Sequence, residues 1–547
     1  MVTLTAFLSY WFQADALIGP NGLNPWEEDL SKVASLTEGG QDSWRKVSLR
    51  PSLLWFSPFA NHHLLFGIGS LAALSLGIGF LPLLSGILCY LCYLSLMVVG
   101  EPFLSFQWDA LLVETLLLSL PFLPAVRFHR FREPLPHSRL ARLLILAILA
   151  KLMLESGIVK FTFYDQDGSN TWRDFTALDY HYWTQPLPHP LSAWIHSLPR
   201  WFDEFSLVSM YAVELALPFL LFFPGNIRRI ALLGQLLLQF AILLSGNYGF
   251  FNLLTMVLCI PLCDDRMFAF LSRERIKVTQ TEALSKFSTG FGLALGLWAL
   301  FLAISWKHLA RDLQGNQPEE SPVLSYPKGI DEIEHALRPL RCFNSYGLFR
   351  VMTRTRPEII IETSRDAEDW QIVRFHWKAS APTDSPRFAG PHMPRIDWQM
   401  WFEGLNCERY AGHPFSRFLY GRFLELTARG AEPNDFSDLP KVLGARETEA
   451  LSQAPPQAQR EALLNYNHLM SSFLSRSLWF GRLLKAIGQG NETVLGQFRE
   501  GSKSHTPANF IRVSLHHYEF STDSNHAWST RAVPTARYVL NLKESSP

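Results

Sequence analysis

The feature that most constrains this chain is a series of long apolar segments in its first 310 residues. A transmembrane helix needs about 20 mostly apolar residues to cross the hydrocarbon core, and about eight segments come near that length. The first two meet at Leu81-Pro82, where the missing proline donor would alternatively break one element in two. The segments are Leu64–Phe80, Leu81–Val99, Trp108–Pro124, Leu140–Phe161, Leu207–Phe223, Ile230–Ser245, Phe250–Cys263 and Phe291–Trp306.

The composition changes to that of a soluble domain at about Ala310. Residues 357–379 place β-branched runs around a polar turn and predict two strands, and residues 513–522 and 536–543 predict further strands. Between them, Phe415–Ala428 and Gln457–Ile487 carry apolar residues at helical spacing. We therefore expect an α-helical polytopic membrane domain followed by a soluble, β-rich α+β domain with a helical insertion at about 408–500.

The expected division of the chain has three parts. Residues 1–50 form an N-terminal segment, in which Gly19–Arg50 is polar and predicted to be solvent-exposed. Residues 51–310 form the transmembrane helical domain, and residues 311–547 form the soluble domain.

The distribution of charge bears on partners and on topology. The chain has 49 Lys plus Arg and 49 Asp plus Glu, and this balance argues against a nucleic-acid partner. Arginines and lysines cluster at 126–142, after Pro224 and after Cys263. Short basic loops stay in the cytoplasm, and these three fall on one side if the segments alternate. The region after Ala310 is then predicted to be non-cytoplasmic.

Six cysteines are too few for a disulfide scaffold. Cys89 and Cys92 form a CxxC inside an apolar run, where a thiolate is disfavoured, so we interpret them as small buried hydrophobic residues. Cys342 and Cys407 are the only two in the soluble domain and could pair in an oxidising compartment.

Polar side chains inside apolar segments are costly in lipid unless they face a packed interior or a wet cavity. Gln107 and Glu114 are seven residues apart on one helix face. With Asp109 they either mark an interfacial helix start or, as we favour, face the bundle interior. Lys151 and Glu155, at i,i+4 spacing, can pair in the bundle.

Lys160 has two interpretations. Its long side chain either snorkels to the membrane interface or lines a cavity with His181 and acts as a desolvated amine base. Glu214 on the next apolar segment would then supply the countercharge. No second histidine stands at ligand spacing in this block, so we expect no metal.

The loop from Tyr164 to Phe205 is long and unusually aromatic. Its rings form either an interfacial belt or a cap over the membrane cavity near Lys160. We expect the loop to fold back and meet the turn at Asn247 and Tyr248, with Tyr248 and Asn252 satisfying backbone groups or a bound ligand. The binding candidates here are Trp172, Arg173, His181, Tyr182, Gln185, Pro186, Glu214, Asn247, Tyr248 and Asn252.

Several strings resemble the lipase maturation factor family, in the same order along the chain. They are residues 103–114 (FLSFQWDALLVE), 171–188 (TWRDFTALDYHYWTQPLP), 245–255 (SGNYGFFNLLT), 261–265, 343–362 and 391–405 (PHMPRIDWQMWFEGL). The resemblance implies a multi-pass membrane protein that assists the maturation of secreted, lipase-like clients. It places the protein in the endoplasmic reticulum if eukaryotic, or in the inner membrane if bacterial. Its soluble-domain motif here is Arg395, Asp397, Trp398, Gln399 and Trp401.

A weaker resemblance in general layout is to vitamin-K-dependent carboxylase-like proteins. It gives an alternative, an intramembrane enzyme with Lys160 or His181 as base and a lipid-like or quinone-like cosubstrate. The main hypothesis needs no cofactor, and its partners are client proteins and membrane lipids.

Overall fold

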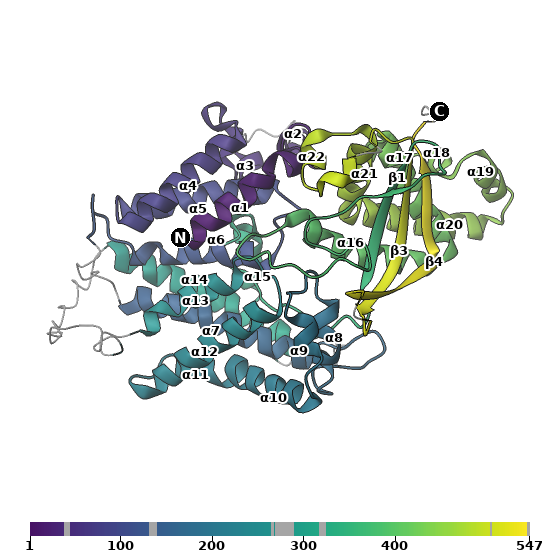
Figure 1. Ribbon diagram of the computed structural model, residues 1–547. Helices are drawn as coiled ribbons and strands as arrows, with labels where there is room; N and C mark the ends of the chain where they lie inside the picture. Colours follow the sequence, from purple (N-terminus) through teal and green to yellow (C-terminus); the bar gives the residue numbers. More distant parts are fainter. Residues whose placement is uncertain are drawn as a thin grey trace.

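The computed structural model describes residues 1–37, 44–130, 139–263, 267, 289–316, 324–503, 506–523 and 525–543. A bundle of helices lies beside a domain that contains one β-sheet (Figure 1). The junction between the two is lined by side chains from both.

Every apolar segment predicted from the sequence is helical in the structure. Three helices of the described chain are long and apolar enough to cross a membrane, by length and composition: Pro82–Val99, Asn226–Ser245 and Gly292–Gln314. A π-helical turn, Ala212–Ala216, joins α10 to α11. The bundle helices are α1 (Val2–Leu17), α4 (His62–Ile78), α5 (Pro82–Val99), α6 (Gln107–Ser119), α7 (Arg139–Thr162), α10 (Arg200–Tyr211), α11 (Leu217–Leu220), α12 (Asn226–Ser245), α13 (Phe251–Leu258) and α14 (Thr289–Gln314).

The segments that meet at Leu81-Pro82 are two packed helices, not one broken element. Helix α4 ends at Gly79, whose φ of 78° suits the left-handed conformation that glycine adopts at low cost. A Cβ at this residue would lie 2.2 Å from the His129 carbonyl oxygen. Pro82 then begins α5, where its missing N–H is no loss.

The prediction of a solvent-exposed stretch at Gly19–Arg50 is wrong in part. The stretch contains α2 (Trp26–Thr37) and α3 (Arg45–Leu49), and Leu23, Trp26 and Leu30 are buried. The stretch was predicted to be exposed because most of its residues are polar, whereas α2 is a short amphipathic helix with one buried face.

The outer face of α10, α11 and α12 is apolar and exposed. Ile230, Leu233, Leu237 and Phe240 of α12 are each more than half exposed. Twenty residues of α12 span about 30 Å, the thickness of a bilayer core. Lipid is the solvent that suits such a face.

The second domain contains an antiparallel four-stranded sheet in the order β2-β1-β3-β4. Its central pair joins Ile359 to Leu515 in register, so distant parts of the chain form one sheet. The predicted strands are confirmed, although β2 is only two residues long. The strands are β1 (Pro357–Ser364), β2 (Gln371–Ile372), β3 (Phe510–Phe520) and β4 (Trp528–Asn541).

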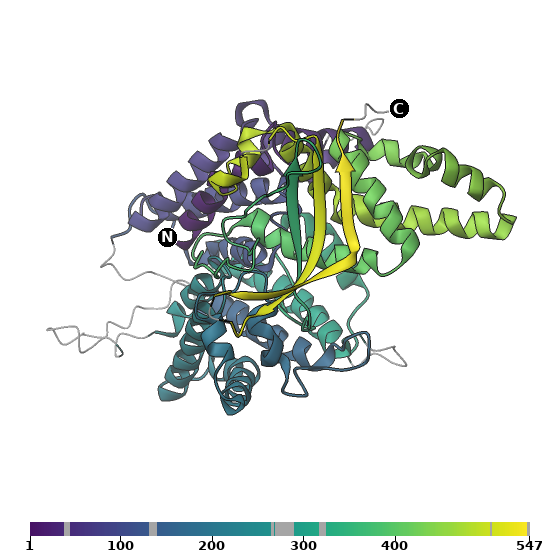
Figure 2. The same ribbon diagram turned by 45° about the vertical axis from the view of Figure 1, so that its right-hand side comes forward.

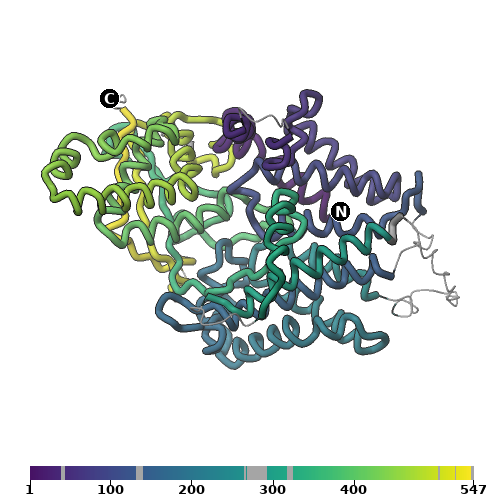
Figure 3. Tube along the Cα trace, turned by 180° about the vertical axis from the view of Figure 1, so that it is seen from behind, coloured from purple at the N-terminus to yellow at the C-terminus, as the bar shows by residue number. Residues whose placement is uncertain are grey.

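Helices occupy most of the chain between β2 and β3, so the domain contains more helix than the β-rich prediction suggested. They begin at Arg395, and the pattern at Gln457–Ile487 is divided at Ser477. Figures 2 and 3 show α19 and α20 projecting at the outer edge of the domain. The remaining helices are α8 (Ala177–Thr184), α9 (Ser192–His196), α15 (Gly329–Leu337), α16 (Arg395–Ala411), α17 (Pro414–Arg429), α18 (Leu439–Leu443), α19 (Ala445–Ser452), α20 (Pro456–Arg476), α21 (Leu478–Gln489) and α22 (Glu492–Leu495).

Helix α16 packs closely on β1, and this contact yields a stability prediction. A Cβ at Gly404 would lie 2.2 Å from the Pro357 carbonyl oxygen. Glycine to alanine normally stabilises a helix by about 1 kcal/mol, but overpacking costs about 1–3 kcal/mol. We expect Gly404→Ala to lower the thermal unfolding midpoint of the protein in detergent by several degrees. Gly501→Ala, where a Cβ meets open space, is the control, and equal midpoints for the two variants would contradict the packing.

Candidate functional site

The candidate site is the junction between the helical bundle and the C-terminal domain. Helix α16 lies along it, and the sequence motif at residues 395–401 begins this helix (Figure 1). Residues three and four apart share a helix face. Arg395, Trp398 and Trp401 therefore lie on one face of α16, and this face points to the bundle.

Arg395 and Asp109 form the most buried ion pair of the junction, with both side chains fully inaccessible. The guanidinium donates from Nη1 to Oδ2 at 2.5 Å and from Nη2 to Oδ1 at 2.7 Å. Tyr93 donates its hydroxyl to Oδ1 at 2.6 Å, and Arg395 also donates to the Phe103 carbonyl. Such a bidentate contact fixes the relative orientation of the two side chains and balances their charges. Asp109 thus faces the interior, as expected, but its cation comes from the other domain.

The start of α16 is also tied to α1. The backbone N–H of Arg395 donates to Gln13 Oε1 at 2.8 Å, and the N–H of Met393 donates to Ser9 Oγ at 2.8 Å. The Arg395 bond satisfies a donor that the helix N-terminus leaves open, and the Met393 bond holds the segment just before the helix. No cue in the sequence marked Ser9 or Gln13, because each lies in a weakly apolar segment.

The other motif residues divide between the two domains. Trp398 packs edge-on against Trp108 of α6 and Tyr248, at centroid distances of 4.8 and 5.8 Å. Trp401 donates its indole N–H to the Thr184 carbonyl at 2.7 Å. Asp397 stays within its own domain, where it accepts the backbone N–H groups of residues 377 and 378. Gln399 is buried, with 8% of its surface exposed.

A second junction contact involves Gln107 and Glu114, which do share a face. Glu114 accepts the hydroxyl of Tyr346 at 2.6 Å, and Gln107 accepts the N–H of Gly347 at 3.1 Å. The expected pairing of Lys151 with Glu155 is replaced by cross-element contacts. Lys151 lies 3.3 Å from Glu114, whereas Glu155 accepts the Tyr346 N–H at 2.8 Å.

Lys160 is buried in an ion pair with Glu214, so it does not snorkel. Its Nζ donates to both carboxylate oxygens, at 2.7 and 3.0 Å, and to the Ser156 carbonyl at 2.9 Å. The ammonium also lies 5.3 Å from the Trp172 ring centroid. Glu214 sits on the π-helical turn, a feature common at functional sites. All three donor directions of the ammonium are used, which favours a structural cation over a free base.

The aromatic loop folds back onto the α12–α13 turn, as expected. Tyr248 donates its hydroxyl to Gln185 Oε1 at 2.9 Å and lies 3.4 Å from His181 Nε2. Gln185 in turn donates to the Ser245 carbonyl at 2.7 Å. Burial lowers the pKa of His181 to about 4, and the nearby charge of Lys160 acts in the same direction. His181 is therefore neutral at physiological pH.

Two candidates in this turn make contacts that the sequence did not specify. Asn247 connects three segments by donating to the carbonyls of Pro188 and Arg387 and accepting the Ala389 N–H. Asn252 bonds a side chain, Gln239 Oε1, at 2.9 Å. The loop aromatics Trp172 and Tyr182 are buried rather than arranged as an interfacial belt.

The remaining loop candidates make local contacts. Tyr182 donates its hydroxyl to Asp203 at 3.2 Å, and exposed Arg173 contacts Tyr164. The Pro186 carbonyl accepts Nη2 of Arg356 at 3.0 Å.

Arg356 is a junction residue that the sequence did not reveal. It is fully buried and donates to the carbonyls of Trp183, Gln185 and Pro186, at the C-terminal end of α8. Cations are favoured at that end of a helix. Glu358 balances its charge at 2.7 Å and also binds Lys378 at 2.7 Å. Arg356 directly precedes the apolar run of β1, where a surface residue is the ordinary interpretation.

The possible pairing of Cys342 with Cys407 is not formed, and one cluster of potential metal ligands occurs among the residues that the structure describes. Cys342 and Cys407 are free and buried, so the disulfide hypothesis is wrong. Asp15, His62 and His63 bring ligand atoms within 4.8 Å of one another. However, Trp11 donates to His63 Nδ1 at 2.9 Å, so the neutral ring carries its proton on Nε2, which faces Asp15. Hydrogen bonding accounts for this cluster without an ion.

The Asp109–Arg395 contact gives the prediction for this site. Removing one partner of a buried pair leaves an unpaired charge and costs about 3–5 kcal/mol. We expect Arg395→Met to lower the unfolding midpoint in detergent strongly, and Asp109→Leu/Arg395→Met to recover part of the loss. The control is Arg200→Ala, which breaks an exposed pair with Glu204 that is worth about 0.5 kcal/mol or less. Similar midpoints for Arg395→Met and Arg200→Ala would contradict the assignment.

Comparison with known proteins matches two parts of the chain to family models. Residues 1–270 match the lipase maturation factor transmembrane domain, and residues 342–431 match the lipase maturation factor C-terminal domain. No solved structure is significantly similar.

Curated relatives show the same similarity across both domains. Lipase maturation factor 2 of Xenopus tropicalis is 31% identical over 519 residues, covering 77% of this chain and 71% of its own. The Homo sapiens protein of that name is 30% identical, covering 79% and 73%. Lipase maturation factor 1 of Bos taurus is 29% identical, covering 74% and 73%.

Proposed function

Because the chain belongs to the lipase maturation factor family, we propose that it is a membrane-embedded factor that assists the folding, maturation or assembly of secreted, lipase-like proteins. The observation that carries this proposal is the similarity over 77% of the chain, with family models in both domains. The enzyme alternative has no support from these relatives, and the ion-paired Lys160 does not favour it.

The junction suggests how such a factor works. The motif on α16, the aromatic loop and the turn at Tyr248 hold the C-terminal domain in one orientation on the bundle. A client that emerges from the membrane would then meet a fixed surface. The site candidates act in this proposal by positioning the domain rather than by performing chemistry.

We expect function to depend on this positioning. The protein would be produced together with a secreted lipase in cells lacking their own maturation factor. The readout is enzymatic activity per mass of secreted lipase. The wild type should raise it, Arg395→Met should lose most of the gain, and Arg200→Ala should behave as wild type. Equal specific activity with and without the protein would contradict the proposal.

We also propose a topology in which the eight apolar segments cross the membrane. The turn between α11 and α12 and the start of α7 lie at the end of the bundle away from the C-terminal domain (Figure 1). Arg142, Arg228 and Arg229 are at that end, which the positive-inside rule assigns to the cytoplasm. The C-terminal domain then faces the lumen of the endoplasmic reticulum in a eukaryote, or the space outside the inner membrane in a bacterium.

Cysteine labelling checks this topology. Five of the six native cysteines are buried and Cys263 is half-buried, so labelling of each new exposed cysteine is compared with that of the parent protein. In spheroplasts, a membrane-impermeant maleimide should label Ser452→Cys at once, and Asn226→Cys only after permeabilisation. The reverse pattern would place the C-terminal domain in the cytoplasm and exclude secreted clients.

A further inference from the structure

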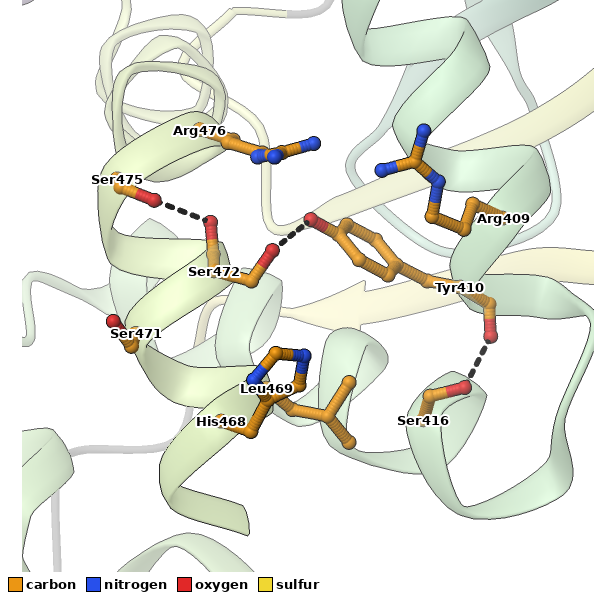
Figure 4. A pocket seen from close by; sticks show the side chains of 9 residues that line it. All are labelled: Arg409, Tyr410, Ser416, His468, Leu469, Ser471, Ser472, Ser475 and Arg476. Carbon is orange, nitrogen blue, oxygen red and sulfur yellow. Dashed lines mark hydrogen bonds between the residues drawn. The ribbon is translucent and has the colours of Figure 1, made fainter. Parts of the chain in front are cut away.

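A hollow of about 360 Å³ lies in the C-terminal domain, outside the junction. Helix α20 forms one wall, and the end of α16 with the start of α17 forms the other (Figure 4). In Figures 1 and 2 this helical part of the domain lies on the side away from the membrane helices. A ligand here would come from the aqueous phase.

The charge of the hollow is positive. Arg409 of α16 and Arg476 of α20 both line it, and both are exposed. Within the part of the chain that the structure describes, neither forms an ion pair, and no carboxylate lines the hollow. Burial raises the pKa of Tyr410, and the charge of Glu403 adds to that rise. The hydrogen bond with Ser472 and the charges of Arg476 and Arg409 oppose it, so both guanidiniums act on one hydroxyl.

Hydroxyl groups and an imidazole complete the lining. The hydroxyls of Tyr410 and Ser472 share a hydrogen bond of 2.9 Å and mark the floor between the two arginines (Figure 4). Ser475 and His468 line the same hollow from α20. Two guanidinium groups with hydroxyls between them can donate hydrogen bonds to the oxygens of an anion. Each guanidinium presents a planar pair of N–H groups, which binds a carboxylate through two hydrogen bonds.

A second hollow of about 510 Å³ adjoins the first along α20 and shares Ser471 and Ser475 with it. Its lining combines Phe436, Met470 and Leu474 with Ser437, Asn467 and the two shared serines. A hollow of mixed polarity beside a cationic one suits an extended peptide that carries apolar and acidic side chains. A free inorganic anion would use only the first of them.

We propose that these two hollows form a docking site for an acidic peptide segment of a client polypeptide, with a carboxylate held between Arg409 and Arg476. The client's identity rests on the proposed function, whereas the peptide chemistry rests on the lining. The site stands apart from the α16 junction face, so it can be altered without breaking the domain contact.

Peptide binding to the full chain in lipid nanodiscs tests the proposal. The probe is a fluorescein-labelled peptide in which Glu alternates with Leu and Ser, and its Gln counterpart is the neutral control. The Glu peptide should bind at least about tenfold more tightly, and salt should weaken it because exposed charges are screened. Equal binding of both peptides would overturn the proposal. The proposal would also be overturned if inorganic phosphate displaced the Glu peptide and the Leu positions added nothing to its affinity. That result would show an anion site only.

Matched variants locate the site. Arg409→Gln/Arg476→Gln should weaken binding of the Glu peptide by at least about tenfold. The control is Arg460→Gln, which removes one exposed charge from the same helix, about 24 Å from Arg476. Leu474→Ala, a half-buried residue of the second hollow, should weaken the Glu peptide and its Gln counterpart alike. Unchanged binding in the double arginine variant, with its thermal midpoint intact, would overturn the assignment.

The lipase secretion assay separates this inference from the proposed function. If wild type raises lipase activity but the double arginine variant does so equally well, the docking site is wrong and the function stands. If the peptide binds as described but wild type never raises lipase activity, the function is wrong and the site stands for another polypeptide.

Discussion

The buried contact between Asp109 and Arg395 is the constraint on which the rest of the structure depends. A carboxylate inside a membrane bundle is costly without a partner, and Tyr93 alone does not balance its charge. The balancing guanidinium arrives from a helix almost three hundred positions later in the chain. A pair of this kind adds little net stability, because desolvation offsets the attraction. The pair fixes the orientation of the C-terminal domain on the bundle, since any other arrangement of the two would leave two buried charges unpaired.

Other buried polar groups also find their partners across the junction between the two domains. Arg356 and Trp401 of the C-terminal domain both donate to backbone carbonyls at the end of α8. Tyr346 joins Glu114 of α6 to Glu155 of α7. Polar groups in the bundle are therefore satisfied by the other domain, and the two parts are interdependent. A factor that must present a fixed surface to folding clients benefits from such rigidity.

Much of the fold follows from the sequence. Segment length and apolarity are local properties, so the helical segments and the strands at 357–364 and 510–520 could be predicted. The partners of buried polar residues could not, because pairing depends on tertiary contacts. One of the two interpretations of Lys160 named Glu214 as its countercharge, whereas the partner considered for Lys151 was Glu155, its neighbour on the helix. Arg356 was missed, because nothing in its neighbours distinguishes a buried arginine from an exposed one.

The central claim is that the start of α16 is locked into the bundle, and hydrogen exchange measures this directly. The N–H groups of Met393 and Arg395 donate to Ser9 and Gln13, and both residues are inaccessible. Mass spectrometry of the intact protein in nanodiscs should therefore find peptides spanning 391–405 exchanging as slowly as those of β1 and β3. Exchange at the rate of exposed α19 would show that the domain is not held at this junction, and would contradict the account.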